Sequence, residues 1–544
     1  MENIKKIKFK LLICSSSFFI IYFGVAFSML MIKPQEKINK QSNLKITEKK
    51  SQIRGNIYDN NGYLIATTIR KYDLIVNPSV LRNPKKFELE LKKIFGNKIN
   101  FHFKDKLSSN LKYLKVKKNI SLKDYNKVLK IGEPGIKIEE SYIRKYPGKS
   151  LAAHIIGKVD VDGKGISGVE KKLNNELSSS KNIHLSIDSG IQNIFKQLLL
   201  EQIIKFQASA GAGIIMNANN GKIKSIISLP DYDNNINNNL SEKQVFNNAT
   251  KGLYELGSTL KIFTAAMAIE SGNGKDDQLI DVSSPILLSK SQKISDIKKI
   301  NFPINLPEII VHSSNIGTAK IASSLGHTIQ DKYFNLLGFL EKVNVEIIET
   351  SLPNINKQVH ISSLMSKSYG YGIQISPLHL AKATSVALNG GKSITPTLLK
   401  TKFFQNQNKQ VFSTETSRKL RSILYLVVND KYGTGKLAKS YYYPIGGKTG
   451  TAKKLIEGRY SETENIVAFT GGFPINKPEY VLTIVIDGPK PQKFSANRNT
   501  AGWVVAPIIG KLVNRIAPIL KIKPLNLEPS ELGLKKYKIR GATL

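Results

Sequence analysis

Eight residues in three short sequence words could together carry out acyl transfer through a serine. A serine hydroxyl is a poor nucleophile at neutral pH, so such an enzyme needs a nearby base, a path for the proton and a cationic site for the substrate's carboxylate. The three words contain residue types for all three tasks. They are Ser258 and Lys261 in S-T-L-K, Ser313 and Asn315 in S-S-N, and Lys448, Thr449, Gly450 and Thr451 in K-T-G-T.

The local setting of the first word favours a catalytic role. The apolar stretch after Gly257 predicts a helix that begins at Ser258 and stops near Gly272. Lys261 would then lie one turn beyond Ser258 and face the same side. Unpaired backbone N–H groups at the start of this helix would favour an oxyanion beside the serine.

The last word is flanked by glycines and followed by a strand-like run at 466–470. We therefore expect K-T-G on an antiparallel strand that lines the substrate cleft, where glycines let a substrate backbone approach closely. Each word is weak evidence alone. The S-x-x-K spacing also occurs at Ser109 to Lys112, Ser178 to Lys181 and Ser295 to Lys298.

The composition limits the possible partners. The 544-residue chain has a formal charge of +40, but its lysines are scattered among Asn and Ile, without the aromatic and basic clusters of a nucleic-acid site. We expect no nucleic-acid partner, although the charge would favour anionic lipids or polymers. The seven histidines and the single cysteine, Cys14, lack metal-ligand spacing, and no metal or organic cofactor is expected.

The N-terminal segment predicts a membrane anchor. Residues 11–32 form a run of 22 uncharged residues, which is long enough to cross a bilayer as a helix. Four lysines precede the run, so the N-terminus is expected in the cytoplasm and the remaining chain outside. A cleaved signal peptide is the alternative, but Met31 to Pro34 does not resemble a small-residue cleavage site.

The pattern of strands and helices predicts a multidomain α+β protein. Two strands near 212–228, the K-T-G strand and two more strands after it surround a helical middle, which indicates one antiparallel five-stranded sheet flanked by helices. An Asn-Gly turn at 61–62 predicts a hairpin in the preceding part. The predicted divisions are a tail at 1–10, the anchor at 11–32, a linker and non-catalytic domain at 33–182, the catalytic domain at 183–520 and a basic tail at 521–544.

Further motifs give the chain a resemblance to the class B penicillin-binding proteins, which are membrane-anchored transpeptidases that cross-link peptidoglycan. Besides the three words, the resemblance is carried by Arg54–Ala66, Asp160–Glu170, Tyr369–Gly372 and Thr500–Pro507, and it covers nearly the whole length. It is strongest to the division-specific septal members. Two positions depart from the family pattern, since Leu256 replaces a proline and Asn60 an arginine.

The resemblance implies a penicillin-binding transpeptidase domain with a helical subdomain, an elongated dimerisation-like pedestal and one transmembrane helix in the bacterial inner membrane, with the catalytic domain in the periplasm. It also implies that Ser258 attacks the stem peptide, Lys261 acts as its base and Ser313 relays the proton. Asn315 would hold Lys261 and the substrate. Beta-lactams would be covalent inhibitors, and an FtsW-type glycosyltransferase and other divisome proteins would be partners.

The substrate carboxylate would then bind to Lys448, Thr449 and Thr451, and the backbone N–H groups of Ser258 and Thr451 would form the oxyanion hole. Three alternative functions remain open: an elongation-type class B transpeptidase, a beta-lactamase or beta-lactam sensor, and a catalytically silent divisome scaffold. A class A lactamase needs a water-activating glutamate in E-x-x-L-N, and Glu170 to Asn174 has this spelling upstream of Ser258.

Overall fold

The computed structural model describes residues 15–16, 19, 22–24, 53–96, 106–107, 109–236, 239–289, 292–401, 409–525 and 530–541. The chain divides into two compact units, Met1–Gln52 and Ile53–Leu544. Among the described residues we find no helix with the length and hydrophobicity needed to cross a bilayer. Most of the predicted anchor at 11–32 lies outside these residues.

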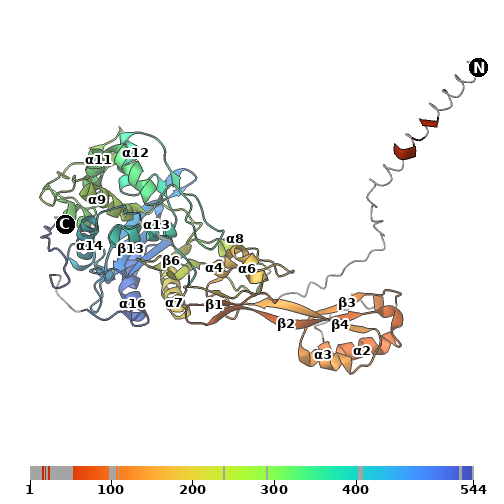
Figure 1. Cartoon of the computed structure of the whole chain (residues 1–544). Coiled ribbons are helices and arrows are strands. Elements are labelled where there is room, and N and C mark those ends of the chain that lie inside the picture. Colours follow the sequence, from red (N-terminus) through yellow and green to blue (C-terminus); the bar gives the residue numbers. More distant parts are fainter. Residues whose placement is uncertain are drawn as a thin grey trace, which may run out of the picture. The chain divides into compact units, whose positions relative to one another are not determined.

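A five-stranded antiparallel sheet forms the centre of the catalytic part (Figure 1). Its strand order is β12-β13-β14-β6-β7, so the first two strands in the sequence and the last three share one sheet, as predicted. The K-T-G strand, β12, lies at the edge. The strands are β6 (Ala210–Asn217), β7 (Ile223–Leu229), β12 (Gly446–Ile456), β13 (Arg459–Phe473) and β14 (Tyr480–Asp487).

Helices cover both faces of this sheet because its side chains are apolar on both sides. Along β13, Ile466 and Ala468 belong to one hydrophobic core, whereas Val467 and Phe469 belong to the other. This alternation follows from the two-residue period of a strand. The first face packs against α13 (Pro377–Leu388), and the second packs against α7 (Ser189–Lys205) and α16 (Ala506–Ile516).

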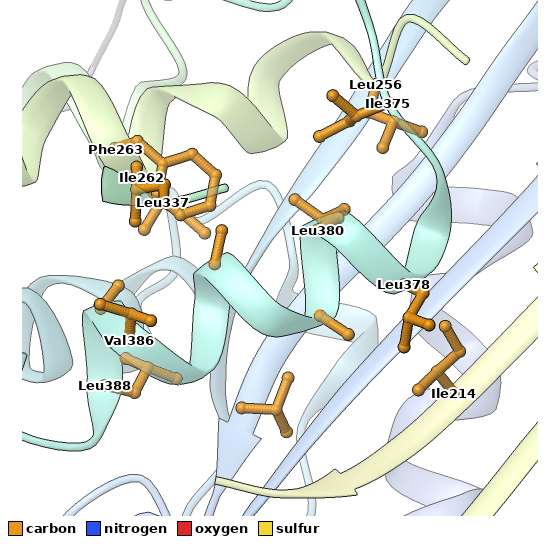
Figure 2. Close-up of a cluster of buried hydrophobic side chains, with 14 of the residues drawn as sticks. Ile214, Leu256, Ile262, Phe263, Leu337, Ile375, Leu378, Leu380, Val386 and Leu388 are labelled. Carbon is orange, nitrogen blue, oxygen red and sulfur yellow. The ribbon is translucent and has the colours of Figure 1, made fainter. Parts of the chain in front are cut away.

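Helix α13 lies between the sheet and the helix that carries Lys261. Figure 2 shows Leu378 of α13 beside Ile214 of β6, and Phe263 of α9 (Lys261–Glu270) on the other side of α13. All three of these side chains are buried. Every residue of α13 except Lys382 is buried, so this internal helix fixes α9 relative to the sheet.

The helical part between β7 and β12 contains the other predicted helices. The helix after S-S-N, α11 (Asn315–Leu336), contains a kink at Gly326, where φ is 76°. The other helices are α10 (Leu306–His312), α12 (Ile361–Ser368) and α14 (Thr414–Asn429). Only short elements complete the described part of this region: α8 (Glu242–Val245), η4 (Gly257–Leu260), β8 (Ile286–Leu287), β9 (Lys293–Ile294), β10 (Asn354–Ile355), β11 (Ile373–Gln374) and η5 (Lys436–Ala438).

The N-terminal part of the second unit has its own sheet and hydrophobic core. The predicted turn at 61–62 joins β1 (Ile57–Tyr58) to β2 (Leu64–Val76), which also pairs with β3 (Leu114–Ile120) and β4 (Ile136–Lys145). Helices α2 (Pro84–Phe95) and α3 (Leu122–Leu129) supply the apolar side chains that cover this sheet. Strand β5 (Ile183–His184) pairs with β1 in parallel and leads into the catalytic part.

A buried ion-pair network in the N-terminal part holds α5 (Gly168–Lys172) against β4 and the segment before β1. Both oxygens of the Glu170 carboxylate are bound, one by Arg54 Nε and one by Arg144 Nε, each at 2.7 Å. Glu170 is fully buried, in α5. A carboxylate held in this way is not free to activate water, so the E-x-x-L-N spelling at Glu170 does not make a lactamase site.

We expect Arg144→Met to lower the free energy of unfolding by roughly 3–5 kcal/mol, because it leaves a buried carboxylate with only one of its two cationic partners. The matched control is Arg70→Met, since Arg70 forms a half-exposed ion pair with Glu140 on the same sheet. Arg70→Met should change the free energy of unfolding by no more than about 1 kcal/mol. Urea unfolding of the three proteins measures both values, and equal losses would contradict a special role for the buried network.

Candidate active site

The serine of the first word lies in a tight turn rather than in the first turn of an α-helix. Residues Gly257–Leu260 form a 3-10 turn, η4, and α9 begins at Lys261, so the predicted helix starts three residues too early. The turn begins at Gly257 with φ of 52°, a conformation that favours glycine. Ser258 is partly exposed, and its hydroxyl is free of hydrogen bonds to the described residues.

Two glycines let this turn pack directly against the K-T-G strand. A Cβ atom on Gly257 would lie 2.7 Å from the carbonyl oxygen of Thr451, and one on Gly450 would lie 2.2 Å from that of Leu256. Both distances are too short for any side chain. The glycine of K-T-G is therefore required by the approach of strand β12 to the serine turn. Leu256, at the position of the family's proline, is buried beside Ile375 (Figure 2).

Lys261 connects the first word to the second. Its Nζ donates hydrogen bonds to the Ser313 carbonyl at 2.6 Å and to Asn315 Oδ1 at 2.7 Å, and it lies 3.3 Å from Ser313 Oγ. The Lys261 side chain is fully buried. The structure thus brings Lys261, Ser313 and Asn315 together, as the ordered words predict.

Ser313 also contacts the third word. Lys448 Nζ donates to Ser313 Oγ at 3.0 Å, so the Ser313 hydroxyl lies between two buried lysines. Ser313 follows the last residue of α10 and has left-handed backbone angles, φ 61° and ψ 42°. This conformation costs a residue other than glycine roughly 1 kcal/mol, so the surrounding contacts must maintain it.

The environment of the two lysines favours their neutral forms. Burial, and secondly repulsion by Lys448, hold the pKa of Lys261 well below its usual value, and Asp296 only partly opposes this shift. Burial lowers the pKa of Lys448 to about 7. A neutral Lys261 can accept a proton, whereas Lys448 is poised to become a cation when an anionic group binds beside it.

These shifts predict how stability depends on pH. The pKa of Lys448 is about 7 in the folded protein and near 10.5 in the unfolded chain, so between these values the unfolded chain binds more protons. The free energy of unfolding should therefore rise with pH, by roughly 2 kcal/mol between about pH 7 and 9, relative to Lys448→Met. Urea unfolding at several pH values measures this difference, and parallel pH curves for the two proteins would contradict the buried-lysine geometry.

Two polar residues that the sequence motifs do not include complete the site. Asp296 accepts hydrogen bonds from Ser314 Oγ at 2.6 Å and from the backbone N–H of Ile316 at 3.1 Å, and so holds the start of α11. Thr434 Oγ1 lies 2.9 Å from Thr449 Oγ1 and 3.5 Å from Lys448 Nζ. Neither residue has a signal in the sequence, although Asp296 lies inside one of the decoy S-x-x-K words.

The threonines of the third word have different surroundings. Thr449 contacts Thr434, whereas Thr451 Oγ1 accepts a hydrogen bond from the backbone N–H of Ala501 at 3.0 Å. Ala501 begins α15 (Ala501–Val504), in the segment that resembles the family's closing motif. That segment therefore supports the far end of the K-T-G strand, and the Thr451 hydroxyl keeps its own hydrogen for another acceptor.

Glu255 ties the serine turn to the Tyr369–Gly372 motif. Its Oε1 accepts hydrogen bonds from the backbone N–H of Gly372 at 2.7 Å and from the Tyr460 hydroxyl at 3.2 Å. Burial raises the pKa of Glu255, and these two hydrogen bonds oppose the rise. The tyrosine-glycine motif thus supports the turn that carries Ser258.

Comparison with known proteins places this geometry in a family. Residues 211–513, more than half of the chain, match the penicillin-binding protein transpeptidase domain, and residues 49–197 match the penicillin-binding protein dimerisation domain. The chain belongs to the class B penicillin-binding proteins. The resemblance inferred from the motifs is therefore confirmed, and the family's mixed α/β fold with two domains accounts for the two sheets described above.

Several relatives of this class B penicillin-binding protein align over most of its length. A probable peptidoglycan D,D-transpeptidase FtsI of Caulobacter vibrioides is 32% identical, over 86% of this chain and 82% of the relative. An FtsI of Buchnera aphidicola is 28% identical over 95% of this chain and 96% of its own. Stage V sporulation protein D of Bacillus subtilis is 28% identical over 87% of this chain and 79% of the relative.

The fold is also similar to that of a solved structure. Penicillin-binding protein 3 of Mycobacterium tuberculosis, in complex with ampicillin, superposes with a TM-score of 0.71 over 90% of this chain and 99% of that one. The two sequences are only 20% identical, so this likeness supports the fold alone.

Proposed function

We propose that this class B penicillin-binding protein is a peptidoglycan D,D-transpeptidase that cross-links stem peptides through an acyl-enzyme on Ser258. The observation that carries the proposal is the bridge from buried Lys261 through partly buried Ser313 to buried Lys448. It joins Lys261, which favours its neutral form, to Lys448, which can become a cation, and Ser258 is partly exposed. The relatives named as D,D-transpeptidases support the same activity.

In the first half-reaction, neutral Lys261 accepts the hydroxyl proton of Ser258 as Ser258 Oγ attacks the carbonyl of the penultimate D-alanine. The backbone N–H groups of Ser258 and Thr451 stabilise the resulting oxyanion. The C–N bond to the terminal D-alanine then breaks, and Ser313 passes a proton from Lys261 to the departing amine. Asn315 holds Lys261 and the substrate amide during these steps.

In the second half-reaction, an amine of a neighbouring stem peptide attacks the ester and releases Ser258, which regains its proton.

Protonated Lys448, with Thr449 and Thr451, binds the carboxylate of the terminal D-alanine before it leaves. Substrate binding would raise the pKa of Lys448, since an anion beside a buried amine favours its charged form. Beta-lactams carry a similar carboxylate and acylating carbonyl, so they would be covalent inhibitors.

We further propose a single-pass inner-membrane protein that acts in septal wall synthesis. The apolar run at 11–32 would be the anchor after a cytoplasmic tail at 1–10, with 33–182 as linker and pedestal, 183–520 as the periplasmic transpeptidase domain and 521–544 as its basic tail. The FtsI names of two relatives favour division. An FtsW-type glycosyltransferase and other divisome proteins would be partners, and an elongation role is the alternative.

The cellular role can be tested by imaging. A fluorescent fusion of the full chain should concentrate at midcell in dividing cells, whereas even labelling of the side wall would favour the elongation role.

The activity can be tested with purified protein. The full chain should form cross-linked peptides when glycan strands bearing stem peptides are supplied, and penicillin should block this reaction. Penicillin hydrolysis without cross-linking would instead favour a lactamase, and neither reaction would favour a scaffold.

A further inference from the structure

The basic segment at 530–541, which we call the brace, packs against the helical part of the catalytic domain. Leu532 and Leu534 are buried in the main hydrophobic core, and the backbone N–H of Lys535 donates to Ser422 Oγ of α14 at 2.9 Å. A lysine-rich segment usually remains solvated, so this packing calls for a structural explanation.

Arg540 in the brace makes a forked ion pair with Glu308 in α10. Arg540 Nε donates to Glu308 Oε1 at 2.8 Å and Nη2 donates to Oε2 at 2.7 Å, while the Arg540 backbone N–H donates to Oε1 at 3.0 Å. Glu308 is fully buried. Burial opposes the ionisation of Glu308, but these hydrogen bonds hold its pKa below the usual value.

The same arginine contacts both ends of the short helix that leads to Ser313. At the start of α10, Arg540 Nη2 donates to the Pro303 carbonyl at 2.8 Å, and Glu308 accepts the backbone N–H of Asn305 at 3.1 Å. At its end, His312 Nε2 donates to the Arg540 carbonyl at 2.7 Å. His312 directly precedes Ser313, so the brace holds α10 near its start and at its end.

The brace also contacts the loop that carries Thr434. A Cβ atom on Gly541 would lie 2.6 Å from the Tyr432 hydroxyl, so the brace backbone lies directly on this ring. The Tyr432 ring is 6.0 Å from that of His312. Tyr432 is two residues before Thr434, which contacts both Lys448 and Thr449. The brace therefore touches the supports of the second and third catalytic words.

We infer that the brace holds the Ser313 turn in its catalytic position, with Arg540 as a positioning residue. Ser313 has a strained backbone, its carbonyl accepts a hydrogen bond from Lys261 Nζ, and its hydroxyl lies between two lysines. Proton transfer depends steeply on such distances, and a displacement of about 1 Å can cost about 100-fold in rate. This inference rests on the proposed function, because its readout is acylation by penicillin.

The test compares the acylation rate constant of full-length wild type with those of Arg540→Gln and Arg540→Lys. Arg540→Gln removes the fork and the charge, and we expect roughly a 10- to 100-fold slower reaction. Arg540→Lys keeps the cation opposite Glu308 but loses the fork, so it should fold and react at an intermediate rate. The matched control is Lys535→Gln, because Lys535 lies in the brace and pairs with Asp276 at the surface, and its rate should not change.

Active-site titration separates positioning from folding. A merely structural brace would lower the fraction of protein labelled at saturation, without changing the rate constant of the labelled fraction. Suppose that wild type is labelled and that both Arg540 variants have the wild-type rate constant per labelled site. This result would overturn the inference and leave the proposed function intact. Wild type that takes no label at all would overturn both.

Discussion

Replacing Ser258 with alanine is expected to abolish covalent labelling by penicillin and all peptide cross-linking, while the protein remains folded. Ser258 is partly exposed and its hydroxyl has no hydrogen-bond partner among the described residues, so losing the hydroxyl removes no structural contact. The free energy of unfolding of the variant should therefore lie within about 0.5 kcal/mol of the wild-type value. Gel fluorescence with a labelled penicillin, together with urea unfolding, measures both results.

The matched control for this experiment is Ser295→Ala. Ser295 begins a decoy S-x-x-K word and lies beside the site, where its backbone carbonyl accepts a hydrogen bond from Asn315 Nδ2 at 3.0 Å. Its side chain is dispensable for that contact, so the control should be labelled like wild type. Full labelling of Ser258→Ala, or loss of labelling in Ser295→Ala alone, would contradict the assignment of the nucleophile.

Replacing Lys261 with methionine is expected to slow acylation by about 10²- to 10⁴-fold, the usual contribution of a general base. Methionine fills most of the volume of the buried lysine, so packing is largely retained, whereas Lys261→Ala would also leave a cavity. Replacement loses the hydrogen bonds of Lys261 to Ser313 and Asn315, but it also removes a buried amine whose depressed pKa destabilises the folded state at neutral pH, so the protein should remain folded. Stopped-flow measurement of the acylation rate constant tests the expected loss.

A buried lysine outside the three sequence words provides the control for Lys261. Lys367 in α12 is 3% exposed, burial also lowers its pKa, and it lies 3.9 Å from Asp331 rather than among the catalytic words. Lys367→Met should therefore acylate at the wild-type rate. A similar loss in both variants would mean that any buried lysine in this part matters, and near-normal acylation of Lys261→Met would remove it from the role of base.

The sequence was sufficient for features that depend on local patterns. Runs of apolar residues predicted the two strands near 212–228, which pair as β6 and β7, and K-T-G lies on an antiparallel strand as expected. The start of the helix at Ser258 was wrong by three residues. A contact distant in the sequence decides that detail, because Gly257 adopts a positive φ where the turn meets Thr451 of β12.

Features that depend on distant contacts could not be predicted from one sequence. Asp296 and Thr434 lie 19 and 14 residues from Asn315 and Lys448, their hydrogen-bond partners, and no motif connects them. Arg540 lies 232 residues from Glu308 in a segment whose lysines suggested only a basic tail. Such residues share no periodicity with their partners, and only the folded chain brings them together.

The most direct test of the central claim is to find the residue that penicillin acylates in the full-length protein. Trypsin would release Ser258 in the peptide Gly252–Lys261 and Ser295 in the peptide Ile294–Lys298, so mass spectrometry can distinguish the nucleophile from its nearest decoy. We predict one penicilloyl adduct, on Ser258. An adduct on any other residue, or no adduct, would contradict a transpeptidase that acts through Ser258.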